Sequence, residues 1–297
     1  MDLKQLEYIL KIAEEKNITH AAEKLYLTQS ALNQQLLKLE KELGTPLFYR
    51  SRIDWRPTPA GEIYLKAARE ILSIKQEAYN RIYDLTETQK GHLSIGFTPG
   101  RGIPMFSYVY PRFHQAHPEV HIEPIELSVR NQQTMLLAES LDIGFITLPK
   151  NRQRAGLQYI PIAREELFLA MPKTLSKIFS VKEDEPFPLI LLKEQPFVLT
   201  HKTSTIRELT DEIFKAAGFE PDVLFETTNN NTIISMIRAG ICCGIVPAYY
   251  ADRSDPALAF YTIEGNPSWD IYAACKKGHY ISKAAREFIS LATDYWT

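Results

Sequence analysis

Apolar side chains recur at intervals of three and four residues through the N-terminal part of the chain, which is the period of amphipathic helices. The first of these helices is marked by Leu3, Leu6, Ile9, Ile12 and Ala13. Thr19 and Thr28 are suitable N-caps for two more, because a threonine hydroxyl can accept a hydrogen bond from a free N–H group at a helix start. The pattern therefore predicts three short helices in succession before Gly44, a residue type that commonly ends a helix.

The third predicted helix divides its side chains between an apolar face and an uncharged polar face. Its apolar positions are Leu32, Leu36, Leu39 and Leu43. Its polar positions are Gln29, Ser30, Asn33 and Gln34, all of which can donate and accept hydrogen bonds. Ala21 and Ala22 in the preceding helix are small enough to let the two helices pack closely. We interpret the polar face as a surface that reads base edges in the DNA major groove; the alternative is the solvated face of a small helical bundle.

A short, positively charged ribbon is predicted after the third helix. Three prolines exclude a long helix in this segment: Pro46, Pro57 and Pro59. Its charge comes from Arg50, Arg52 and Arg56, which outnumber the single Asp54. Arginines on such a two-stranded wing suit contacts with DNA phosphates or insertion into the minor groove.

A long helix is predicted from Pro59 to Thr86. Thr58 is a suitable N-cap, and Pro59 fits the first helical position, where no N–H group is needed. The apolar stripe of this helix consists of Ile63, Ala67, Ile71, Ile74, Ala78, Ile82 and Leu85. A stripe of this length favours pairing with the same helix of a second copy of the chain; packing on the chain's own core is the alternative.

Strand-like and helix-like segments alternate from His92 onward. The predicted strands span residues 92–97, 120–126, 142–147, 166–171, 196–200, 223–227, 243–247 and 270–275. One predicted helix follows the first strand and ends near Gln115. The other predicted helices span residues 132–140, 204–217, 230–239 and 282–293. This alternation predicts a parallel sheet covered by helices. A second unit is expected to begin near Arg164, and the C-terminal strand and helix are expected to return to the first unit.

Composition and cysteine content exclude few classes of protein. The chain has 297 residues, a net charge of −2 and 45% hydrophobic residues, which is typical of a globular protein and gives no overall signature of nucleic-acid binding. It has no segment resembling a signal peptide and no apolar run long enough to cross a membrane, so we expect a cytoplasmic protein. Cys242, Cys243 and Cys275 fit a reducing compartment. The adjacent pair is expected to act as small buried hydrophobes, with a peroxide-sensing disulfide as the alternative.

The N-terminal motifs resemble those of one known family. In order, the chain has the Ala21–Ala22 helix, Gln-Ser-Ala-Leu-Asn-Gln-Gln-Leu at residues 29–36, Glu-Leu-Gly-Thr-Pro-Leu-Phe at 42–48 and Thr-Pro-Ala-Gly at 58–61. This order resembles the winged helix-turn-helix of LysR-type transcriptional regulators. The chain departs from the family pattern at Asn33, Gln34 and Leu37, where serine, arginine and a basic residue are common. We expect these changes to alter which DNA site is read without abolishing DNA binding.

The resemblance implies an α+β protein with three parts. A winged helix-turn-helix DNA-binding domain would occupy residues 1–58, a linker and dimerisation helix residues 59–89, and a two-lobed α/β effector-binding domain, similar to periplasmic binding proteins, residues 90–297. Lobe I would comprise residues 90–162 and 267–297, and lobe II residues 163–266. The resemblance also implies a bacterial regulator that binds double-stranded DNA as a homodimer or homotetramer, responds to a small-molecule effector and acts on RNA polymerase, without a cofactor.

A candidate effector site follows from the predicted strand ends. Ligands of α/β sheets bind where strands end and helices begin, because free N–H groups and the helix dipole attract anions. The predicted strand ends carry Thr98, Pro99, Ser128, Thr147, Thr200, Thr203 and Thr227, and the resemblance implies that these residues surround the effector. Arg101 is placed to bind a carboxylate or phosphate bidentately, so we expect a small anionic metabolite. The alternative is that the threonines cap helices and Arg101 faces solvent.

No catalytic set is evident in the chain. It lacks a Gly-x-Ser-x-Gly elbow, a P-loop and the glycine pattern of a dinucleotide site. His114, His117 and His121 have a spacing that could ligate a metal, but Pro118 interrupts the segment, and we interpret them as surface histidines without a metal. We therefore expect a regulator and not an enzyme. The competing class is an intracellular solute-binding or enzymatic protein whose N-terminal helices serve oligomerisation.

Overall fold

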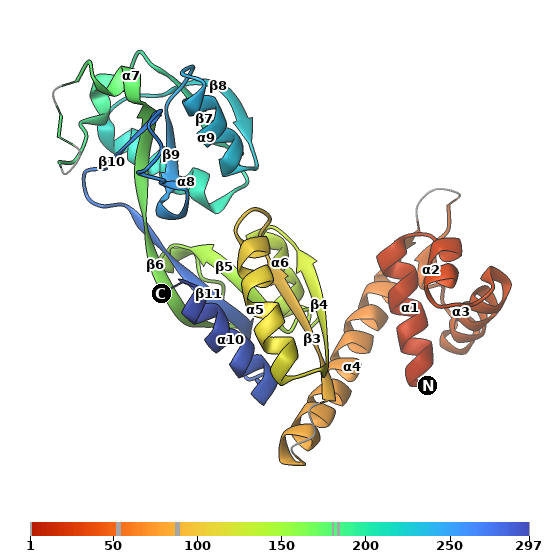
Figure 1. Ribbon diagram of the computed structural model, residues 1–297. Helices are drawn as coiled ribbons and strands as arrows, with labels where there is room; N and C mark the ends of the chain where they lie inside the picture. Colours follow the sequence, from red (N-terminus) through yellow and green to blue (C-terminus); the bar gives the residue numbers. More distant parts are fainter. Residues whose placement is uncertain (1, 52–54, 87–89, 180, 183–184, 297) are drawn as a thin grey trace. The chain divides into compact units, whose positions relative to one another are not determined.

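The computed structural model describes residues 2–51, 55–86, 90–179, 181–182 and 185–296. These residues form two compact units. The first unit extends to Gly91, and the second extends from His92 onward, apart from residues 137–140, which group with the first. Figure 1 labels the α-helices of both units and strands β3–β11.

Three helices form the N-terminal part of the first unit: α1 (Leu3–Glu15), α2 (Ile18–Lys24) and α3 (Gln29–Leu43). The prediction that Thr28 caps α3 is confirmed, because its side chain accepts a hydrogen bond from the N–H of Ala31. The prediction that Thr19 caps α2 is wrong. Asn17 is the N-cap, and its amide oxygen accepts hydrogen bonds from two backbone N–H groups, including that of Thr19. As predicted, α3 ends at Gly44, which has a left-handed backbone with φ of 69°.

The core of the first unit is built from the apolar faces of these helices. Leu32, Leu36 and Leu39 of α3 are almost fully buried and belong to one cluster with Ala21 and Ala22 of α2. Burying a leucine of this kind stabilises the fold by roughly 1.5–3 kcal/mol. The apolar face of α3 is therefore confirmed over its first three positions.

Leu43, the fourth apolar position of this helix, is not part of the core. Its side chain is 45% exposed. Leu43 lies in the last turn of α3, beyond Leu39, which is the last leucine of α3 in the core cluster. Periodicity alone does not show where along a helix the neighbouring elements stop covering it.

The predicted ribbon is present as β1 (Phe48–Tyr49) and β2 (Arg56–Pro57). The two strands pair antiparallel, with Phe48 opposite Pro57. The Phe48 side chain is buried in the core of the first unit, whereas Tyr49 is exposed. At the base of the ribbon, the Thr58 hydroxyl donates a hydrogen bond of 2.7 Å to the carbonyl of Pro46. This bond ties the ribbon to the start of the next helix.

The predicted long helix is α4 (Pro59–Leu85). Its start is confirmed, because the Thr58 side chain accepts a hydrogen bond from the N–H of Gly61 and Pro59 occupies the first position. The helix packs against α1 and buries Leu65 and Ala68. Most of its predicted apolar stripe is open to solvent. Among its large side chains, Ile63 is 74% exposed, Ile74 69% and Leu85 83%.

Lobe I of the second unit contains β3 (Lys90–Phe97), β4 (Glu119–Glu126) and β5 (Ile143–Leu148). Strand β3 lies between the other two and pairs parallel with β5. The connecting elements are α5 (Gly102–Ala116), α6 (Val129–Leu137) and the 3-10 helix η1 (Lys150–Arg152). One face of the sheet packs against α5, and the other face packs against α6. The sheet is therefore covered by helices on both faces, as predicted.

The sheet is mixed, which corrects the prediction of a parallel sheet. Two long strands, β6 (Leu157–Pro172) and β11 (Ser268–Lys276), pair antiparallel with each other, and β11 also pairs antiparallel with β5. With β10 (Leu258–Thr262) at one edge, the strand order is β10-β6-β11-β5-β3-β4, and β9 (Gly244–Pro247) also pairs with β6. These two long strands connect the lobes, as Figure 1 shows. Hydrophobic periodicity identifies a buried strand but not the direction of its neighbours.

The predicted strand at 166–171 covers only the second half of β6. The first half was not predicted, and it contains Pro161, a residue type that is disfavoured inside strands. The structure accommodates Pro161 with a register shift. Ala163 lies opposite Ile271, and Pro161 lies opposite Tyr272, so that Ile162 is an extra residue on its strand.

Lobe II is built around the second half of β6. Strands β9 (Gly244–Pro247) and β10 (Leu258–Thr262) pair antiparallel with it, and β10 was not predicted. Strands β7 (Pro196–Thr200) and β8 (Asp222–Thr227) form a parallel pair. The helices are α7 (Lys173–Ser176), α8 (Thr205–Ala217), α9 (Asn230–Arg238) and the 3-10 helices η2 (Leu189–Leu192) and η3 (Ala248–Tyr250).

The last helix, α10 (Lys283–Trp296), returns to lobe I, as predicted. It packs against α5, and Figure 1 shows the two helices side by side. Phe288 of α10 meets Phe113 of α5 edge to face, with 5.3 Å between the ring centres. In the described part of the chain, no helix combines the length and the apolar character needed to cross a membrane.

Candidate functional site

The polar face of α3 is open to solvent. Gln29, Ser30 and Gln34 are exposed, and Asn33 is half-buried. The Ser30 hydroxyl lies 3.1 Å from that of Thr28, so a hydrogen bond orients it at the start of the helix. Because residues four apart on a helix share a face, the four predicted base-reading side chains form one surface.

The wing arginines differ in their surroundings. Arg50 donates a hydrogen bond to one carboxylate oxygen of Glu40 on α3. The other oxygen of Glu40 accepts the backbone N–H of Leu47 at 2.8 Å. Arg50 therefore joins the wing to the recognition helix. Arg56 is exposed on β2, whereas Arg52 lies outside the described residues.

A pocket of about 470 Å³ lies where the strands of the second unit end, and we name it the strand-end pocket. It is lined by residues 98–101, 128–129, 147, 200–201, 203–206, 228–230, 250 and 269. The structure thus brings together all but one of the residues that were named from the strand ends. Those that line the pocket are Thr98, Pro99, Arg101, Ser128, Thr147, Thr200 and Thr203.

Thr227 is the exception. It is the last residue of β8, and its hydroxyl accepts a hydrogen bond from the N–H of Asn229, while its carbonyl accepts one from the N–H of His201. Its place on the pocket wall is taken by Thr228, Asn229 and Asn230. Successive residues of a strand face opposite sides, and the sequence pattern does not show at which residue β8 turns away from the sheet.

Four helices begin at the wall of the pocket: α5, α6, α8 and α9. Three of their starts are capped by polar side chains, namely Ser128, Ser204 and Asn229, each of which accepts a backbone N–H. The start of α5 at Gly102 has no side-chain cap. The aligned peptide dipoles place roughly half a positive charge at each helix start. The pocket therefore has a positive potential before any side-chain charge is counted.

Arg101 lies in the wall of the pocket and is only 6% exposed, so the alternative that it faces solvent is wrong. Its Nη1 donates a hydrogen bond of 2.5 Å to Glu165 on β6. The guanidinium also lies over three aromatic rings, with 4.7 Å to the ring centre of Trp296, 5.5 Å to Tyr249 and 5.7 Å to Trp269. These contacts combine a buried ion pair with cation–π interactions.

Glu165 on β6 holds Arg101 and two of its aromatic neighbours in place. Its carboxylate accepts the indole N–H of Trp269 at 2.7 Å and the backbone N–H of Tyr249 at 2.9 Å, in addition to Arg101. Glu165 lies where β6 stops pairing with β11 and begins to pair with β9. Arg101 of lobe I is therefore linked through Glu165 to Tyr249 of lobe II.

A second buried arginine supports the lobe II wall. Arg207 of α8 donates hydrogen bonds to the carbonyl of Thr200 at 2.9 Å, to Glu226 at 2.7 Å and to Asp211 at 2.7 Å. Burial opposes the charge of Arg207, but the hydrogen bonds to its two carboxylate partners raise its pKa above the usual value. The hydrogen bond from Arg207 lowers the pKa of Glu226. These bonds fix the end of β7, which carries Thr200.

Several pocket residues were not found from the sequence. Tyr250 and Trp269 reach the pocket from η3 and β11, far from the other strand ends in the chain, and nothing in the local pattern singles them out. Glu165, which bonds to Arg101 from β6, was also not singled out by the local sequence pattern. Asn229 and Asn230 do have a signal, because consecutive asparagines after a strand favour a helix start.

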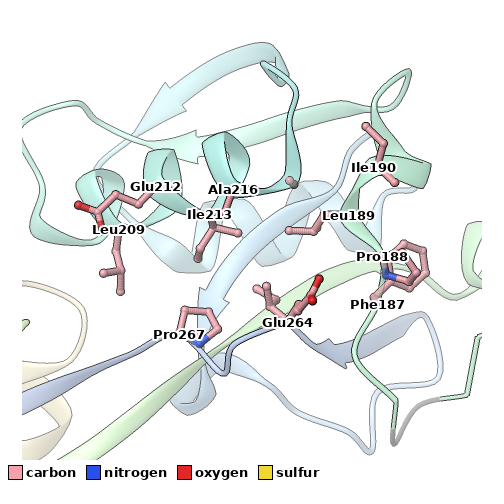
Figure 2. A pocket seen from close by; sticks show the side chains of 12 residues that line it. Phe187, Pro188, Leu189, Ile190, Leu209, Glu212, Ile213, Ala216, Glu264 and Pro267 are labelled. Carbon is pink, nitrogen blue, oxygen red and sulfur yellow. The ribbon is translucent and has the colours of Figure 1, made fainter.

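A second pocket, of about 550 Å³, is lined mainly by lobe II (Figure 2). It is lined by residues 187–190 before and within η2, by the α8 residues Leu209, Glu212, Ile213, Ala216 and Ala217, and by Ile263, Glu264 and Pro267. Its walls are mainly apolar. It does not include the strand ends, and no sequence motif indicated it.

The histidines and cysteines lie outside both pockets, except for His201, which lines the strand-end pocket. His117 bonds to Glu287 at 2.6 Å, His114 stacks on Tyr110, and His121 lies beside His92. Within the described residues, no three side chains of the metal-binding types gather in one place.

All three cysteines are buried free thiols. Burial raises the pKa of Cys242 to about 11 and that of Cys243 to about 12. Burial also raises the pKa of Cys275. Because the thiolate is the reactive form, these pKa values favour the interpretation of the cysteines as small hydrophobes.

Taken together, the first unit is a winged helix-turn-helix, and the second is a two-lobed α/β domain with a pocket at its strand ends. This combination defines a class of DNA-binding regulators with a small-molecule domain. Residues 3–62 match the model of the bacterial regulatory helix-turn-helix proteins of the LysR family, and residues 86–297 match the LysR substrate binding domain. The chain therefore belongs to the LysR family of transcriptional regulators.

Similar proteins agree with this assignment. An uncharacterized HTH-type transcriptional regulator, YcgK of Bacillus subtilis (strain 168), is 26% identical, with 99% of this chain and 94% of the relative covered. The Hca operon transcriptional activator HcaR of Escherichia coli (strain K12) is also 26% identical, with 99% and 98% covered. The crystal structure of full-length CbnR complexed with its target DNA is similar with a TM-score of 0.63 and 25% identity, covering 99% of both chains. The chain is a LysR-type DNA-binding transcriptional regulator, and its family is one of transcriptional regulators.

Proposed function

We propose that this regulator changes its action on transcription when a small anionic molecule binds in the strand-end pocket. The observation that carries the proposal is the convergence of four helix starts on one pocket of about 470 Å³. That volume lies within the range of small-molecule sites, which is roughly 300–1,000 Å³. Helix starts attract negative charge through their dipoles and their free N–H groups.

The lining of the pocket suits a molecule with an anionic end and an apolar body. Hydroxyl groups of Thr98, Ser128 and Thr147 can donate hydrogen bonds to an anion. Ile206 and Trp269 supply apolar surface for the rest of the ligand. Such a mixture of apolar lining and a few polar groups is usual in ligand sites.

DNA recognition is proposed to use the exposed face of α3 and the wing. Gln29, Ser30, Asn33 and Gln34 would read base edges in the major groove, since amide and hydroxyl side chains can match the donors and acceptors presented there. Arg50, Arg52 and Arg56 would contact the phosphate backbone. For Arg50, the bond to Glu40 supports a second role, because it keeps the wing at a defined place relative to α3.

Self-association is proposed to use the exposed apolar stripe of α4. Ile63, Ile74 and Leu85 are each more than two-thirds exposed, which is costly for large apolar side chains on an isolated chain. A second copy of α4 would cover them, and two reading heads related by a two-fold axis would match a palindromic site. A homotetramer would form from two such dimers. RNA polymerase is the partner through which a change at the operator would alter transcription.

Signal transfer is proposed to use the strands that join the lobes. The pocket has walls from both lobes, and β6 and β11 are the described strands that connect them. A ligand that contacts both walls favours the lobe arrangement it fits best. It can shift the population only by the difference between its affinities for the two arrangements.

The test is a thermal-shift screen of the full-length protein against a library of small metabolites, because a ligand that binds the folded state raises its melting temperature. Each hit is repeated with Ser128→Ala and with the control Ser107→Ala, which changes an exposed serine of α5. The proposal predicts hits whose binding is weaker in Ser128→Ala than in the natural chain but is unchanged in Ser107→Ala. These hits should also alter binding to operator DNA. Hits that bind Ser128→Ala, Thr98→Ala and the control equally well would place the ligand elsewhere and refute the proposal.

A further inference from the structure

Arg101 uses only part of its hydrogen-bonding capacity. Nη1 is bonded to Glu165, but Nε and Nη2 have no hydrogen-bond partner among the described residues, although both atoms are buried. Nε and Nη2 lie on the same edge of the planar guanidinium. That edge presents two parallel N–H groups, which is the geometry that a carboxylate accepts with both of its oxygens.

Leaving this edge unpaired is unfavourable. A buried donor without an acceptor costs roughly 1–3 kcal/mol, and buried polar groups in proteins are almost always satisfied. Arg101 lines the strand-end pocket, so a molecule in that pocket can supply the missing acceptors. The edge is therefore a candidate binding point for the anionic group of a ligand.

Glu165 limits how much negative charge the pocket can accept. Arg101 and Glu165 form a buried pair of opposite charges, with side-chain exposures of 7% and 8%. Among the described residues that line the pocket, Arg101 is the one with a permanent charge, and His201 is the other group that can be cationic. A first carboxylate on Arg101 places two anions on one guanidinium. A second anionic group on the same ligand would find helix dipoles but no further arginine or lysine of the described lining.

We propose that the strand-end pocket is selective for monocarboxylates, which bind to the Nε–Nη2 edge of Arg101, and that Glu165 sets this selectivity through its negative charge. The inference rests on the proposed function of the pocket and adds the charge class of its ligand. Glu165 acts without contacting the ligand. It offsets the charge of Arg101 and holds its other side, which leaves the carboxylate-binding edge available.

Tryptophan fluorescence can report the binding of a ligand to Arg101. Trp269 and Trp296, two of the three tryptophans of the chain, lie over the Arg101 guanidinium. A carboxylate that binds to Arg101 changes the charge next to both indoles. Binding is therefore expected to change the intrinsic tryptophan fluorescence of the full-length protein.

The experiment titrates the full-length protein at constant ionic strength with acetate and benzoate, and with the dicarboxylates malonate and phthalate. Fluorescence and melting temperature are followed for the natural chain, Glu165→Gln and the control Glu166→Gln, which changes an exposed carboxylate next along β6. The expected result is a preference for the monocarboxylates in the natural chain and in the control. In Glu165→Gln all four anions are expected to bind more tightly. The affinity for the dicarboxylates should rise more than that for the monocarboxylates, by about tenfold, which corresponds to roughly 1.4 kcal/mol of binding free energy.

Arg101→Lys provides a second test that keeps the positive charge but removes the paired N–H edge. It is expected to weaken benzoate binding by about tenfold or more, because a lysine binds a carboxylate as a point charge. Equal selectivity in Glu165→Gln and Glu166→Gln would overturn the proposal. So would the absence of any response to monocarboxylates at millimolar concentration in both the natural chain and Glu165→Gln. If an anionic library ligand without a carboxylate then bound in a manner dependent on Ser128, the proposed function would stand while this inference failed.

Discussion

The carboxylate of Glu40, in the last turns of the recognition helix, is bonded to the guanidinium of Arg50 on the wing. The same carboxylate accepts the N–H of Leu47, so one nearly buried side chain holds three consecutive parts of the DNA-binding domain. In this structure the position of the wing depends on a residue of α3, the helix that we propose to read the bases.

Replacing Glu40 by alanine is expected to destabilise the N-terminal domain by about 2 kcal/mol, because the buried N–H of Leu47 and the Arg50 guanidinium both lose their acceptor. The melting temperature of the full-length protein and its affinity for operator DNA should both fall. Glu42→Ala, at an exposed position of the same helix, is the control. Unchanged DNA affinity in a folded Glu40→Ala variant would show that the wing does not depend on this bond.

Asn33→Ala tests the reading surface of α3. We expect it to cost roughly 1–3 kcal/mol at the preferred operator and to reduce the discrimination between operator variants, because an amide reads a base edge directly. The measurement is fluorescence anisotropy with a set of duplexes that differ by one base pair. If the order of preference among the duplexes stays the same, Asn33 is not a base-reading residue.

Arg56→Gln tests the wing. A phosphate contact carries no sequence information, so this change should weaken binding to all duplexes alike. It should also reduce the slope of log affinity against log salt concentration by about one. Lys66→Glu, a charge change on the exposed side of α4, is the control. It shows whether a change of net charge alone weakens DNA binding. A selective loss for one duplex would assign Arg56 to base reading instead.

Ile74→Lys tests the exposed stripe of α4. A charge at a position that is 69% exposed in one chain should leave the fold of that chain intact. If a second copy covers this position, the charge must be buried, and the dimer should dissociate at micromolar concentration. Sedimentation velocity of Ile74→Lys and of the Lys66→Glu control measures the difference. Equal association of the two variants would exclude Ile74 from the interface.

The buried thiols predict a pH dependence of stability. Burial raises the pKa of Cys242 from 9.0 to about 11, so the thiol stays protonated in the folded state at pH values where the unfolded chain ionises. The contribution of the thiol to stability is therefore complete below pH 9.0 and is lost as the pH rises towards 11. Denaturant unfolding across this range should show a shallower loss for Cys242→Ala than for the natural chain. Fast alkylation of the folded protein by iodoacetamide at neutral pH would contradict the burial.

Sequence patterns were reliable where local chemistry decides the structure. The starts of α3 and α4 follow from Thr28, Thr58 and Pro59, whose effects act within one helical turn. The end of α3 follows from Gly44 in the same way. All the residues predicted from the strand ends except Thr227 line the pocket, because parallel strands place their ends at one edge of a sheet.

Sequence patterns failed where distant segments meet. The antiparallel direction of β11 beside β5, the paired first half of β6 and the approach of Trp269 to Arg101 all depend on contacts between residues more than a hundred positions apart. Leu43 shows the same limit on a smaller scale: its helical period was correct, but its exposure depends on where the neighbouring elements end.

By itself, the sequence determined the helix-turn-helix, the wing, the long helix and the positions of most strand ends, because caps, prolines and apolar periodicity act on neighbouring residues. Only the tertiary structure decided that Arg101 is buried against Glu165 with one edge unpaired, and that Arg50 holds the wing through Glu40. Both depend on a partner that the fold brings from another element. The charge that an arginine offers to a ligand is set by that partner, and residue type alone does not reveal it.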